Sequence, residues 1–232
     1  MPTRAERRDT TEVAIIAAGT RLLAQGGAEA LTIRGIAREL DLVPSALYRY
    51  VTNRDDLLEL LVRHAHADLA ASIRAAHDAV PRGDLVGRWR VFAYTLRAWS
   101  LAHRHEWKLI QNTTLSERNQ IAHQDYAVHV LLLRLAADAE AAGRVPEPLL
   151  DGSRRAVPGL PALLRLAGVE VSEQTVLPGL AAWHLLDGAL YVELLDSTGL
   201  PGLTDPAVYY DAMVAATERL VLGHGPGEGP VP

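Results

Sequence analysis

The segment Leu31–Leu58, LTIRGIARELDLVPSALYRYVTNRDDLL, constrains the possible folds of this chain more than any other segment. Ile36 and Leu40 lie on one face of a predicted helix, and Leu47 and Val51 repeat the same spacing a few residues later. The interval between the two pairs leaves room only for a tight turn. The segment therefore predicts two short helices joined by a turn and followed directly by a longer helix.

The turn and the second short helix have the size and chemistry of an element that reads DNA. Asp41, in the turn, is a residue type that tolerates a left-handed backbone. Pro44 suits the first turn of the next helix, where its missing N–H is not needed. That helix spans about two turns. The side chains that we expect it to expose are those of Ser45, Ala46, Tyr48 and Arg49. An exposed helix of this kind fits the DNA major groove.

The composition of the chain favours an all-α protein. Ala and Leu dominate, aromatic residues make up only 5% of the 232 residues, and there is a single Phe. Apolar residues account for 49%, which is enough for a substantial buried core. The chain has no Cys, which excludes disulfides, thiolate metal ligands and cysteine nucleophiles.

The beginning of the chain lacks the features of a targeting or membrane segment. The apolar stretch Val13–Ala24 is interrupted by Thr20 and Arg21, so it predicts neither a signal peptide nor a membrane span. We therefore expect a soluble cytoplasmic protein with no membrane partner.

Charge is distributed unevenly along the chain. The net formal charge is −5, which by itself argues against nucleic acid as a partner. Residues 1–54, however, contain eight Arg and six acidic residues, whereas residues 55–232 contain fifteen Lys or Arg and twenty-two acidic residues. A slightly basic head on an acidic body confines any contact with DNA phosphates to the head.

Capping patterns divide the head into helices. Asp9 predicts the start of a first helix, which Gly26-Gly27 ends. Thr32 suits the N-cap of the second helix. Asn53 caps a fourth helix that continues without a breaker to Pro81.

The rest of the chain is predicted to form a helical body. We expect helices that begin at Asp84, run from Ser116 to Gly143, cover about 175–196 with a perturbation at Pro178-Gly179, and extend from Pro206 to Leu222. Residues 103–114 form a short polar and aromatic stretch. Residues 144–171 are expected to be irregular, with at most a short helix near 162–167. This gives a head over 1–54, a body over 55–222 and a disordered tail over 223–232.

The stretch Val13–Leu61 resembles the DNA-binding head of TetR-family transcriptional regulators. The resemblance rests on an apolar first helix that ends in Gly-Gly, on LTIRGIARELDLV, and above all on LYRYVTNRDDLL. It implies an N-terminal three-helix bundle with a helix-turn-helix, followed by a larger helical body that binds an effector and dimerises. Two residues depart from the family pattern. Asp41 stands where Gly is usual, and Val43 stands where many members have a capping Ser.

The resemblance also implies roles for individual residues of the head. Phosphate contacts are expected from Arg34, Tyr48 and Arg54, and base-edge or groove contacts from Pro44, Ser45, Ala46, Arg49 and Tyr50. Arg49 is the natural reader of guanine, because its guanidinium fork matches O6 and N7 together. For Tyr48 the alternative role is a core aromatic that fixes the helix. For Arg54 the alternative is a surface ion pair.

A second, weaker resemblance lies in the run WHLLDGALYVEL, from Trp183 to Leu194. It is similar to the Trp-(His)-Gly signature of one type of TetR-family C-terminal domain, with Asp187 in the place where His is common. In that family the last two long helices pair with their copies in a homodimer. Gly188 suits such a close approach of helices, and it equally suits packing within one chain.

The sequence carries no recognisable catalytic or metal-binding motif. His64 and His66, like His103 and His105, are spaced by two residues, which directs their rings to opposite sides of a helix and does not favour a zinc site. A phosphate-binding Gly-rich loop, a nucleophile elbow and a clear triad are all missing from the sequence. We therefore predict no metal, no cofactor and no enzymatic activity.

Polar side chains within the apolar helices of the body are the candidates for an effector site, because small-molecule sites are apolar cavities with a few converging polar groups. These candidates are Trp107, Gln111, Asn112, His123, Tyr126, His129, Trp183, His184, Asp187 and Tyr191.

The main hypothesis is a ligand-responsive repressor that binds a palindromic DNA operator as a homodimer and is released by a small-molecule effector. The alternative is a helical small-molecule-binding or enzymatic protein that does not bind DNA. The acidic body favours the alternative, whereas the intact LYRYVTNR run argues against it.

Overall fold

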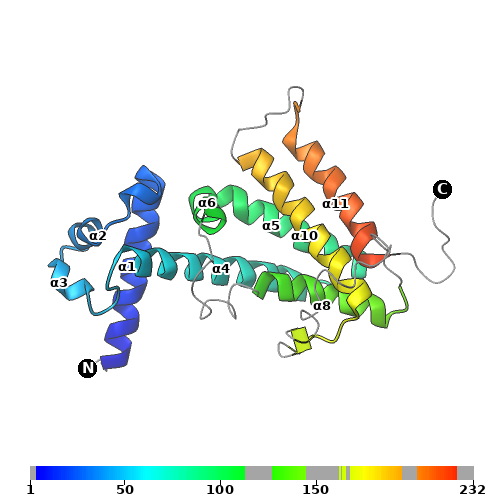
Figure 1. Cartoon of the computed structure of the whole chain (residues 1–232), viewed down its shortest axis with the longest axis horizontal. Coiled ribbons are helices and arrows are strands. Elements are labelled where there is room, and N and C mark those ends of the chain that lie inside the picture. Colours follow the sequence, from blue (N-terminus) through cyan, green and yellow to red (C-terminus); the bar gives the residue numbers. More distant parts are fainter. Residues whose placement is uncertain are drawn as a thin grey trace. The chain divides into compact units, whose positions relative to one another are not determined.

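The computed structural model describes residues 4–112, 127–144, 162, 164–165, 168–194 and 203–223. All regular secondary structure in these residues is helical, which confirms the predicted all-α class (Figure 1). The head contains α1 (Arg4–Gly26), the 3₁₀ turn η1 (Ala28–Ala30), α2 (Ile33–Glu39) and α3 (Pro44–Leu47). The following helices are α4 (Arg54–Asp78), α5 (Leu85–Ala102), α6 (Arg104–Asn112), α8 (Ala127–Ala141), α10 (Glu173–Leu194) and α11 (Pro206–Leu222).

Side-chain caps begin α2 and α4 at the predicted positions. The Thr32 hydroxyl accepts a hydrogen bond from the backbone N–H of Gly35 at 2.9 Å. The Asn53 side-chain oxygen accepts from the backbone N–H of Asp56 at 2.8 Å. The Asp56 carboxylate in turn accepts from the backbone N–H of Thr52 at 3.0 Å. These bonds satisfy N–H groups that have no partner within a helix.

The end of α1 was predicted correctly and its start was not. Gly27 has a φ of 65°, and its N–H donates to the carbonyl of Leu23 at 2.8 Å, so the Gly-Gly pair ends the helix as predicted. The helix begins at Arg4, however, so the prediction of Asp9 as its N-cap is wrong. The residues before Asp9 are mostly good helix formers, and no breaker separates them from the helix.

The helix α3 is shorter than the two turns predicted. It covers only Pro44–Leu47, with Pro44 in its first turn as expected. Turns then follow, in which the N–H groups of Tyr50 and Val51 donate to the carbonyl of Leu47 at 2.8 Å and 3.0 Å. Val43 supplies no side-chain cap at the start, and the capping segment of α4 follows at once. Both features limit the length of α3.

A compact apolar core fixes the head helices. Leu47, Val51 and Ile36, which defined the predicted apolar face, are all buried. The buried members of this core are Ile15, Ala18, Leu22, Leu23, Leu31, Ile36, Ala37, Leu47, Val51, Leu57, Leu60, Leu61, Val62 and Leu109. Burial of each large aliphatic side chain stabilises the head by about 1.5–3 kcal/mol.

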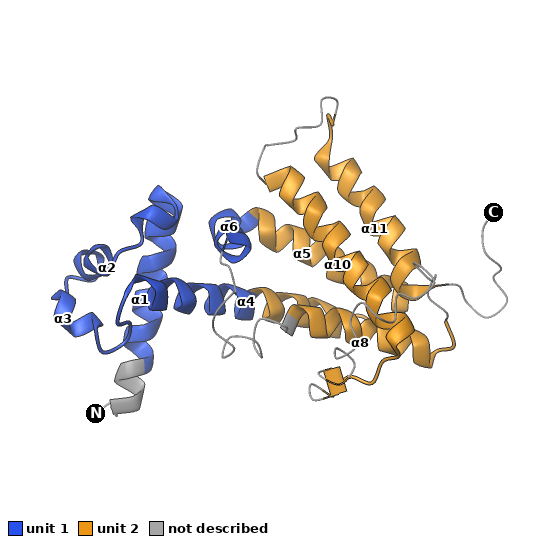
Figure 2. Cartoon of the chain, viewed as in Figure 1, with its two compact units in different colours: residues 1–68, 102–125 blue, residues 69–101, 126–232 orange. Residues whose placement is uncertain are grey.

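The chain divides into two compact units, residues 1–68 with 102–125 and residues 69–101 with 126–232 (Figure 2). Residues 54–68 of α4 belong to the first unit, and residues 69–78 belong to the second. The helix α6 belongs to the same unit as the head. The predicted functional limits at residues 54 and 222 stay a prediction, because a compact unit and a function need not share a boundary.

The helix α6 lies in the polar and aromatic stretch 103–114, for which the sequence predicted no helix boundaries. Residues 104–112 form a helix in which Trp107 and Leu109 are buried. Leu109 joins the core of the head, and α6 packs against α1. The polar and aromatic composition of this stretch obscured its helical character, and its partner α1 lies far away in the sequence.

In the second unit, buried hydrogen bonds join α5 to α11. The indole N–H of Trp89 donates to the carbonyl of Val214 at 3.1 Å, and the hydroxyl of Tyr210 donates to the carbonyl of Ala93 at 2.8 Å. All these contacts are buried, so each one stabilises the packing by about 1 kcal/mol relative to an unpaired state. Figure 1 shows α10 and α11 side by side.

The helix α10 is longer at its start than predicted and is not broken. It begins at Glu173 and passes through Pro178 near its beginning. A Cβ atom added at Gly179 would lie 2.8 Å from a methyl group of Leu133, which shows how closely α10 approaches α8. Glu140 of α8 also accepts a hydrogen bond from the Thr175 hydroxyl at 2.9 Å. Tertiary contacts thus maintain the helix where proline removes one bond.

Other predicted boundaries of the body are met in part. The Asp205 carboxylate caps α11 by accepting from the N–H of Ala207 at 3.0 Å, and the helix ends at Leu222 as predicted. Gly143, with a φ of 77°, follows the end of α8. The predicted start of that helix at Ser116 lies outside the described residues, as do most of 144–161 and the tail after 223.

Candidate DNA interface and effector sites

The predicted base-contacting residues lie on α3 and on the turn that follows it. Pro44, Ser45 and Arg49 are exposed, while Ala46 and Tyr50 are half-buried. These five side chains surround the buried Leu47, so one anchored residue sets the position of the whole surface. A helix that enters a DNA groove needs a short exposed face that the protein core holds in place, and this surface has both features.

Tyr48 is 53% exposed. Its ring is therefore available to a partner, which argues against the alternative role as a core aromatic. Leu42 and Val43 are also exposed, at 40% and 65%, immediately before α3. The sequence interpretation treated Val43 only as a missing cap and did not identify this exposed apolar pair. Exposed apolar side chains beside the recognition helix are suited to contact with thymine methyl groups.

Asp41 has a φ of 53° and is the non-glycine residue with positive φ among the described residues. The turn of the helix-turn-helix therefore has the left-handed backbone that the sequence predicted. Left-handed geometry strains most side chains, and Asp tolerates it better than most. The departure from the usual Gly preserves the turn at a cost in stability.

Of the predicted phosphate contacts, Arg34 is exposed on the first turn of α2. Arg54 is engaged by the protein itself. Its Nη2 donates to the carbonyl of Ala28 at 2.7 Å, and its Nε donates to the carbonyl of Leu31 at 3.2 Å. The Glu29 carboxylate lies 3.9 Å from the same guanidinium. Arg54 thus ties the start of α4 to the segment before α2, and its role toward DNA stays a prediction.

The predicted effector residues are distributed over both compact units. Trp107, Gln111 and Asn112 lie on α6 in the first unit, whereas His129 of α8 and Trp183, His184, Asp187 and Tyr191 of α10 lie in the second. His123 and Tyr126 lie outside the described residues. As a set, these residues remain a prediction.

The structure brings together two of these residues, His129 and Trp183. Their rings are 4.2 Å apart between centroids and tilted by 52°, and both side chains are half-buried. His184 and Tyr191, by contrast, are exposed on α10. They share this exposed row with Gly188, and a Cβ atom added at Gly188 would meet no atom within 4 Å. The alternative that Gly188 is required for packing within the chain is therefore not supported.

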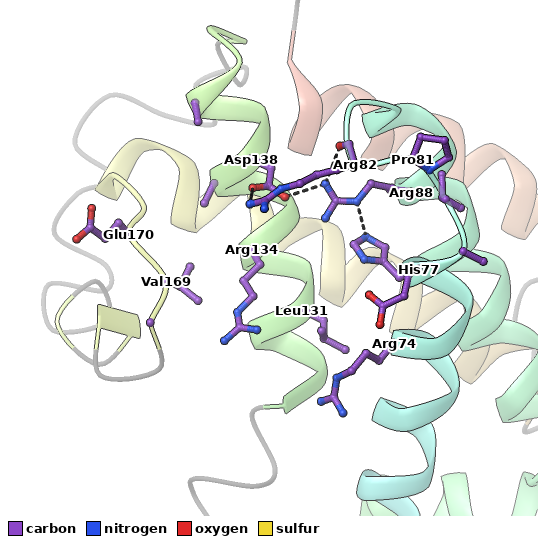
Figure 3. A pocket seen from close by; sticks show the side chains of 16 residues that line it. Arg74, His77, Pro81, Arg82, Arg88, Leu131, Arg134, Asp138, Val169 and Glu170 are labelled. Carbon is purple, nitrogen blue, oxygen red and sulfur yellow. Dashed lines mark hydrogen bonds and ion pairs between the residues drawn. The ribbon is translucent and has the colours of Figure 1, made fainter.

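The second unit contains a cavity of about 1020 Å³ that the sequence interpretation did not anticipate (Figure 3). It is lined by the end of α4, the turn before α5, the start of α5, one face of α8 and residues 168–170. Its lining residues are Arg74, His77, Asp78, Ala79, Val80, Pro81, Arg82, Arg88, Leu131, Arg134, Ala137, Asp138, Ala141, Gly168, Val169 and Glu170. Of the predicted effector residues that the structure describes, none lines it.

A network of charged side chains forms one wall of this cavity. Asp138 accepts from Arg88 at 2.7 Å and from Arg82 at 3.2 Å. Burial alone would raise the pKa of Asp138, but the hydrogen bonds from the two arginines outweigh it and lower this pKa. Arg88 is buried and also donates from Nε to Nε2 of His77 at 3.2 Å. Burial lowers the pKa of His77, and the positive charge of Arg88 lowers it further.

The only sequence signal for this site is spacing. Arg74 and His77 share one face of α4, and Arg134 and Asp138 share one face of α8. Such spacing is as typical of a solvated surface as of a ligand site, so it does not identify a cavity by itself.

Metal binding and membrane insertion find no support in the described residues. No group of three or more His, Asp or Glu side chains in them is placed to hold a metal ion. Within the same residues, every helix is too short or too polar to cross a membrane.

Comparison with known proteins bears on the head first. Residues 15–61 match the family model for bacterial regulatory proteins of the TetR family, and these residues span α1 to the first part of α4. The match includes most of the buried core of the head, the turn at Asp41 and the exposed helix α3. This chain carries a DNA-binding head of the TetR family. It is a transcriptional regulator with a helix-turn-helix DNA-binding domain.

Whole-chain similarity extends to other regulators. The chain is 27% identical to the HTH-type transcriptional regulators Mb1846 of Mycobacterium bovis and Rv1816 of Mycobacterium tuberculosis, over 95% of this chain and 96% of each relative. The solved structure of SCO4313, described as a regulatory protein, is 25% identical and has a TM-score of 0.70, over 93% of this chain and 98% of that one. A TetR-family regulatory protein from Rhodococcus RHA1 shares the fold, with 18% identity and a TM-score of 0.59, over 90% of this chain and 96% of that one.

Proposed function

We propose that this TetR-family regulator is a repressor that binds a palindromic operator as a homodimer in the cytoplasm and is released by a small-molecule effector. The observation that carries the DNA-binding part is the exposed face of α3. Pro44, Ser45 and Arg49 are exposed there, whereas Leu47 is buried in the core of the head. The side chains expected to contact bases are therefore held in place by a buried residue. Arg49 is suited to a bidentate contact with guanine, and Arg34 to a phosphate.

The homodimer is supported by apolar residues that single-chain packing leaves uncovered on the last two helices. Leu185 and Tyr191 of α10 are 40% and 48% exposed, and Val208 of α11 is 62% exposed. Gly188 lies in the same exposed part of α10 and would allow a second helix to approach closely. A dimer with twofold symmetry presents two copies of α3, which is why the operator is expected to be a palindrome.

Effector release requires that the effector prefer one conformation of the protein over another. The helix α4 begins at a cap in the head and ends at the cavity of the second unit, so it is the element that connects the two functions along the chain. We propose that an effector bound in the body favours a state in which the two heads no longer match successive major grooves.

The competing proposal is a helical small-molecule-binding or enzymatic protein that has lost DNA binding. The acidic body favours it through electrostatic repulsion, and the cavity suits it as well as a regulator. It requires that the exposed residues of α3 have no partner, and their intact pattern argues against this.

A mobility-shift assay on the DNA that flanks its own gene separates the two proposals. We expect a discrete complex that competitor DNA of unrelated sequence does not displace. Arg49→Ala should weaken binding to the cognate site by about 1–3 kcal/mol and relax base preference at one position. If the confirmed dimer bound none of the flanking DNA at low salt, the repressor proposal would be wrong.

A further inference from the structure

Exposed apolar side chains gather where the turn of the head meets α3. Among the described residues, eight large apolar side chains are exposed, and three of them, Leu42, Val43 and Tyr48, lie within seven consecutive residues. Val43 is 65% exposed, although valine is most often buried in folded proteins. A single exposed apolar side chain needs no explanation, whereas several neighbouring ones are a candidate binding surface.

The backbone holds Leu42 and Val43 in defined positions. The N–H of Leu42 donates to the carbonyl of Ala37, in α2, at 2.8 Å. The carbonyl of Val43 accepts from the N–H of Ala46, in α3, at 2.9 Å. The two apolar side chains are therefore presented by a hydrogen-bonded turn between the two helices.

Val43 occupies a position where a polar residue would stabilise the fold better. It is the N-cap residue of α3 and supplies no side-chain hydrogen bond to that helix. Ser, Thr, Asp or Asn at an N-cap accepts such a bond and stabilises the helix. An exposed valine here thus weakens the start of α3, and a partner with an apolar surface would offset this loss.

The partner that fits this surface is the major groove of DNA. Leu42 and Val43 directly precede Pro44, so they continue the surface of α3, which lies at the edge of the first unit (Figure 2). Residues 42–48 contain no charged side chain, and the preceding Asp41 is acidic, so this part of the head is not suited to phosphates. The apolar group that base pairs present in the major groove is the C5-methyl group of thymine.

We propose that Leu42 and Val43 help to determine operator specificity by packing against the C5-methyl group of thymine, in the same half-site in which Arg49 contacts a guanine. This inference rests on the proposed function, since it names a second base that the same surface reads. The side chains of the pair have no hydrogen-bond donor or acceptor, so they distinguish base pairs only by apolar contact. A base pair without the methyl group is therefore bound less tightly at this position.

Replacement of thymine by deoxyuridine tests the proposal, because it removes the methyl group and keeps the base pairing and the O4 acceptor. The DNA is a duplex that the full-length protein selects from a pool of random sequences, and each thymine of one half-site is replaced in turn. We expect the dissociation constant to rise roughly three- to fivefold at one or more positions, as expected for a single buried methyl group. A selected half-site without thymine, or an unchanged affinity after every replacement, would overturn the proposal.

Matched variants assign the effect to the apolar pair. Val43→Ala removes most of the side chain, and neither valine nor alanine caps a helix, so the start of α3 should be unaffected. We expect this variant to bind the selected duplex more weakly and to lose most of the deoxyuridine penalty at one position. Leu42→Ala should do the same at the same or a neighbouring position. Val13→Ala is the control, because Val13 is also 65% exposed but lies on α1, and it should keep the full penalty.

Thermal melting shows that each variant is folded. Folded Val43→Ala and Leu42→Ala variants that both kept the full deoxyuridine penalty would overturn the proposal, because the methyl group would then act through the shape of the DNA and not through the pair.

The outcome is distinct from that of the mobility-shift assay. A protein that selects a duplex but responds to deoxyuridine at no position loses only this assignment, and its DNA binding stands. A protein that selects no duplex contradicts both the repressor proposal and this inference.

Discussion

At the scale of single residues, Arg54 is a charged side chain whose hydrogen bonds lie within the head itself. Its two hydrogen bonds to the carbonyls of Ala28 and Leu31 fasten α4 to the segment before α2. Arg54→Ala should therefore lower the free energy of unfolding by about 1–2 kcal/mol, in addition to any loss of DNA affinity. Urea unfolding measures the first effect. The salt dependence of operator binding measures the second, and its slope should fall by about one if Arg54 also contacts a phosphate.

Arg34 provides the matched control for Arg54. It is exposed, and it makes no ion pair with the residues that the structure describes. Arg34→Ala should weaken operator binding and leave the unfolding midpoint unchanged within error. If the two variants had the same effect on stability, the hydrogen bonds of Arg54 would contribute nothing measurable.

Asp41 gives a second prediction at this scale. Its φ of 53° is unfavourable for a residue with a Cβ atom, whereas glycine adopts it without strain. Asp41→Gly should stabilise the head by up to about 1 kcal/mol, since relief of strain outweighs the greater entropy of the unfolded chain. Asp41→Ala keeps the Cβ atom and loses the tolerant side chain, so it should destabilise. Thermal melting of both variants checks the order. A less stable Asp41→Gly would indicate a structural role for the carboxylate.

At the scale of the helices, the contact between α4, α5 and α8 makes stability depend on pH. His77 of α4 faces Arg88 of α5, and the carboxylates of Asp78 and Asp138 lie close enough to oppose part of the effect. The pKa of His77 is below its usual 6.5 in the folded protein, so the unfolded chain binds the proton more readily. The stabilisation is present above pH 6.5 and is lost as pH falls through the lowered value.

Urea midpoints at about pH 7.5 and about pH 5.5 measure this dependence, since the paired Asp138 stays ionised over that interval. We expect lower stability at the acidic pH. In His77→Gln the side-chain oxygen can still accept from Arg88 and does not titrate, so the difference should shrink. The pH dependence of stability that remains in this variant is expected to come from His66, because burial lowers the pKa of His66 as well. An unchanged difference in the variant would show that His77 does not control it.

The helices also show what the sequence could and could not predict. Thr32, Asn53 and Asp205 start helices through bonds to residues two or three positions away, so their roles were predictable from local spacing. The helix α6 was not, because Leu109 is buried by a core whose other members lie far away in the sequence. The cavity depends on Arg74, Leu131 and Val169, which three separate segments bring together. Residue spacing within one segment does not predict a contact between segments that are far apart in the sequence.

At the scale of the whole molecule, the proposed homodimer depends on a surface that one chain leaves open. A Cβ atom added at Gly188 would meet nothing within 4 Å, so Gly188→Ala should be tolerated within a single chain. The same helix exposes Leu185 and Tyr191. If α10 packs against its copy there, a large side chain at position 188 would force the two helices apart.

Gly188→Leu should therefore raise the dimer dissociation constant roughly tenfold or more, as measured by sedimentation equilibrium. Far-ultraviolet circular dichroism should be unchanged, since leucine favours a helix more than glycine does. Operator affinity should fall with dimerisation and recover at high protein concentration, because the heads themselves are intact. A wild-type monomer at micromolar concentration would contradict the homodimer. A Gly188→Leu variant that dimerises like the wild type would instead assign the dimer to another face of the body.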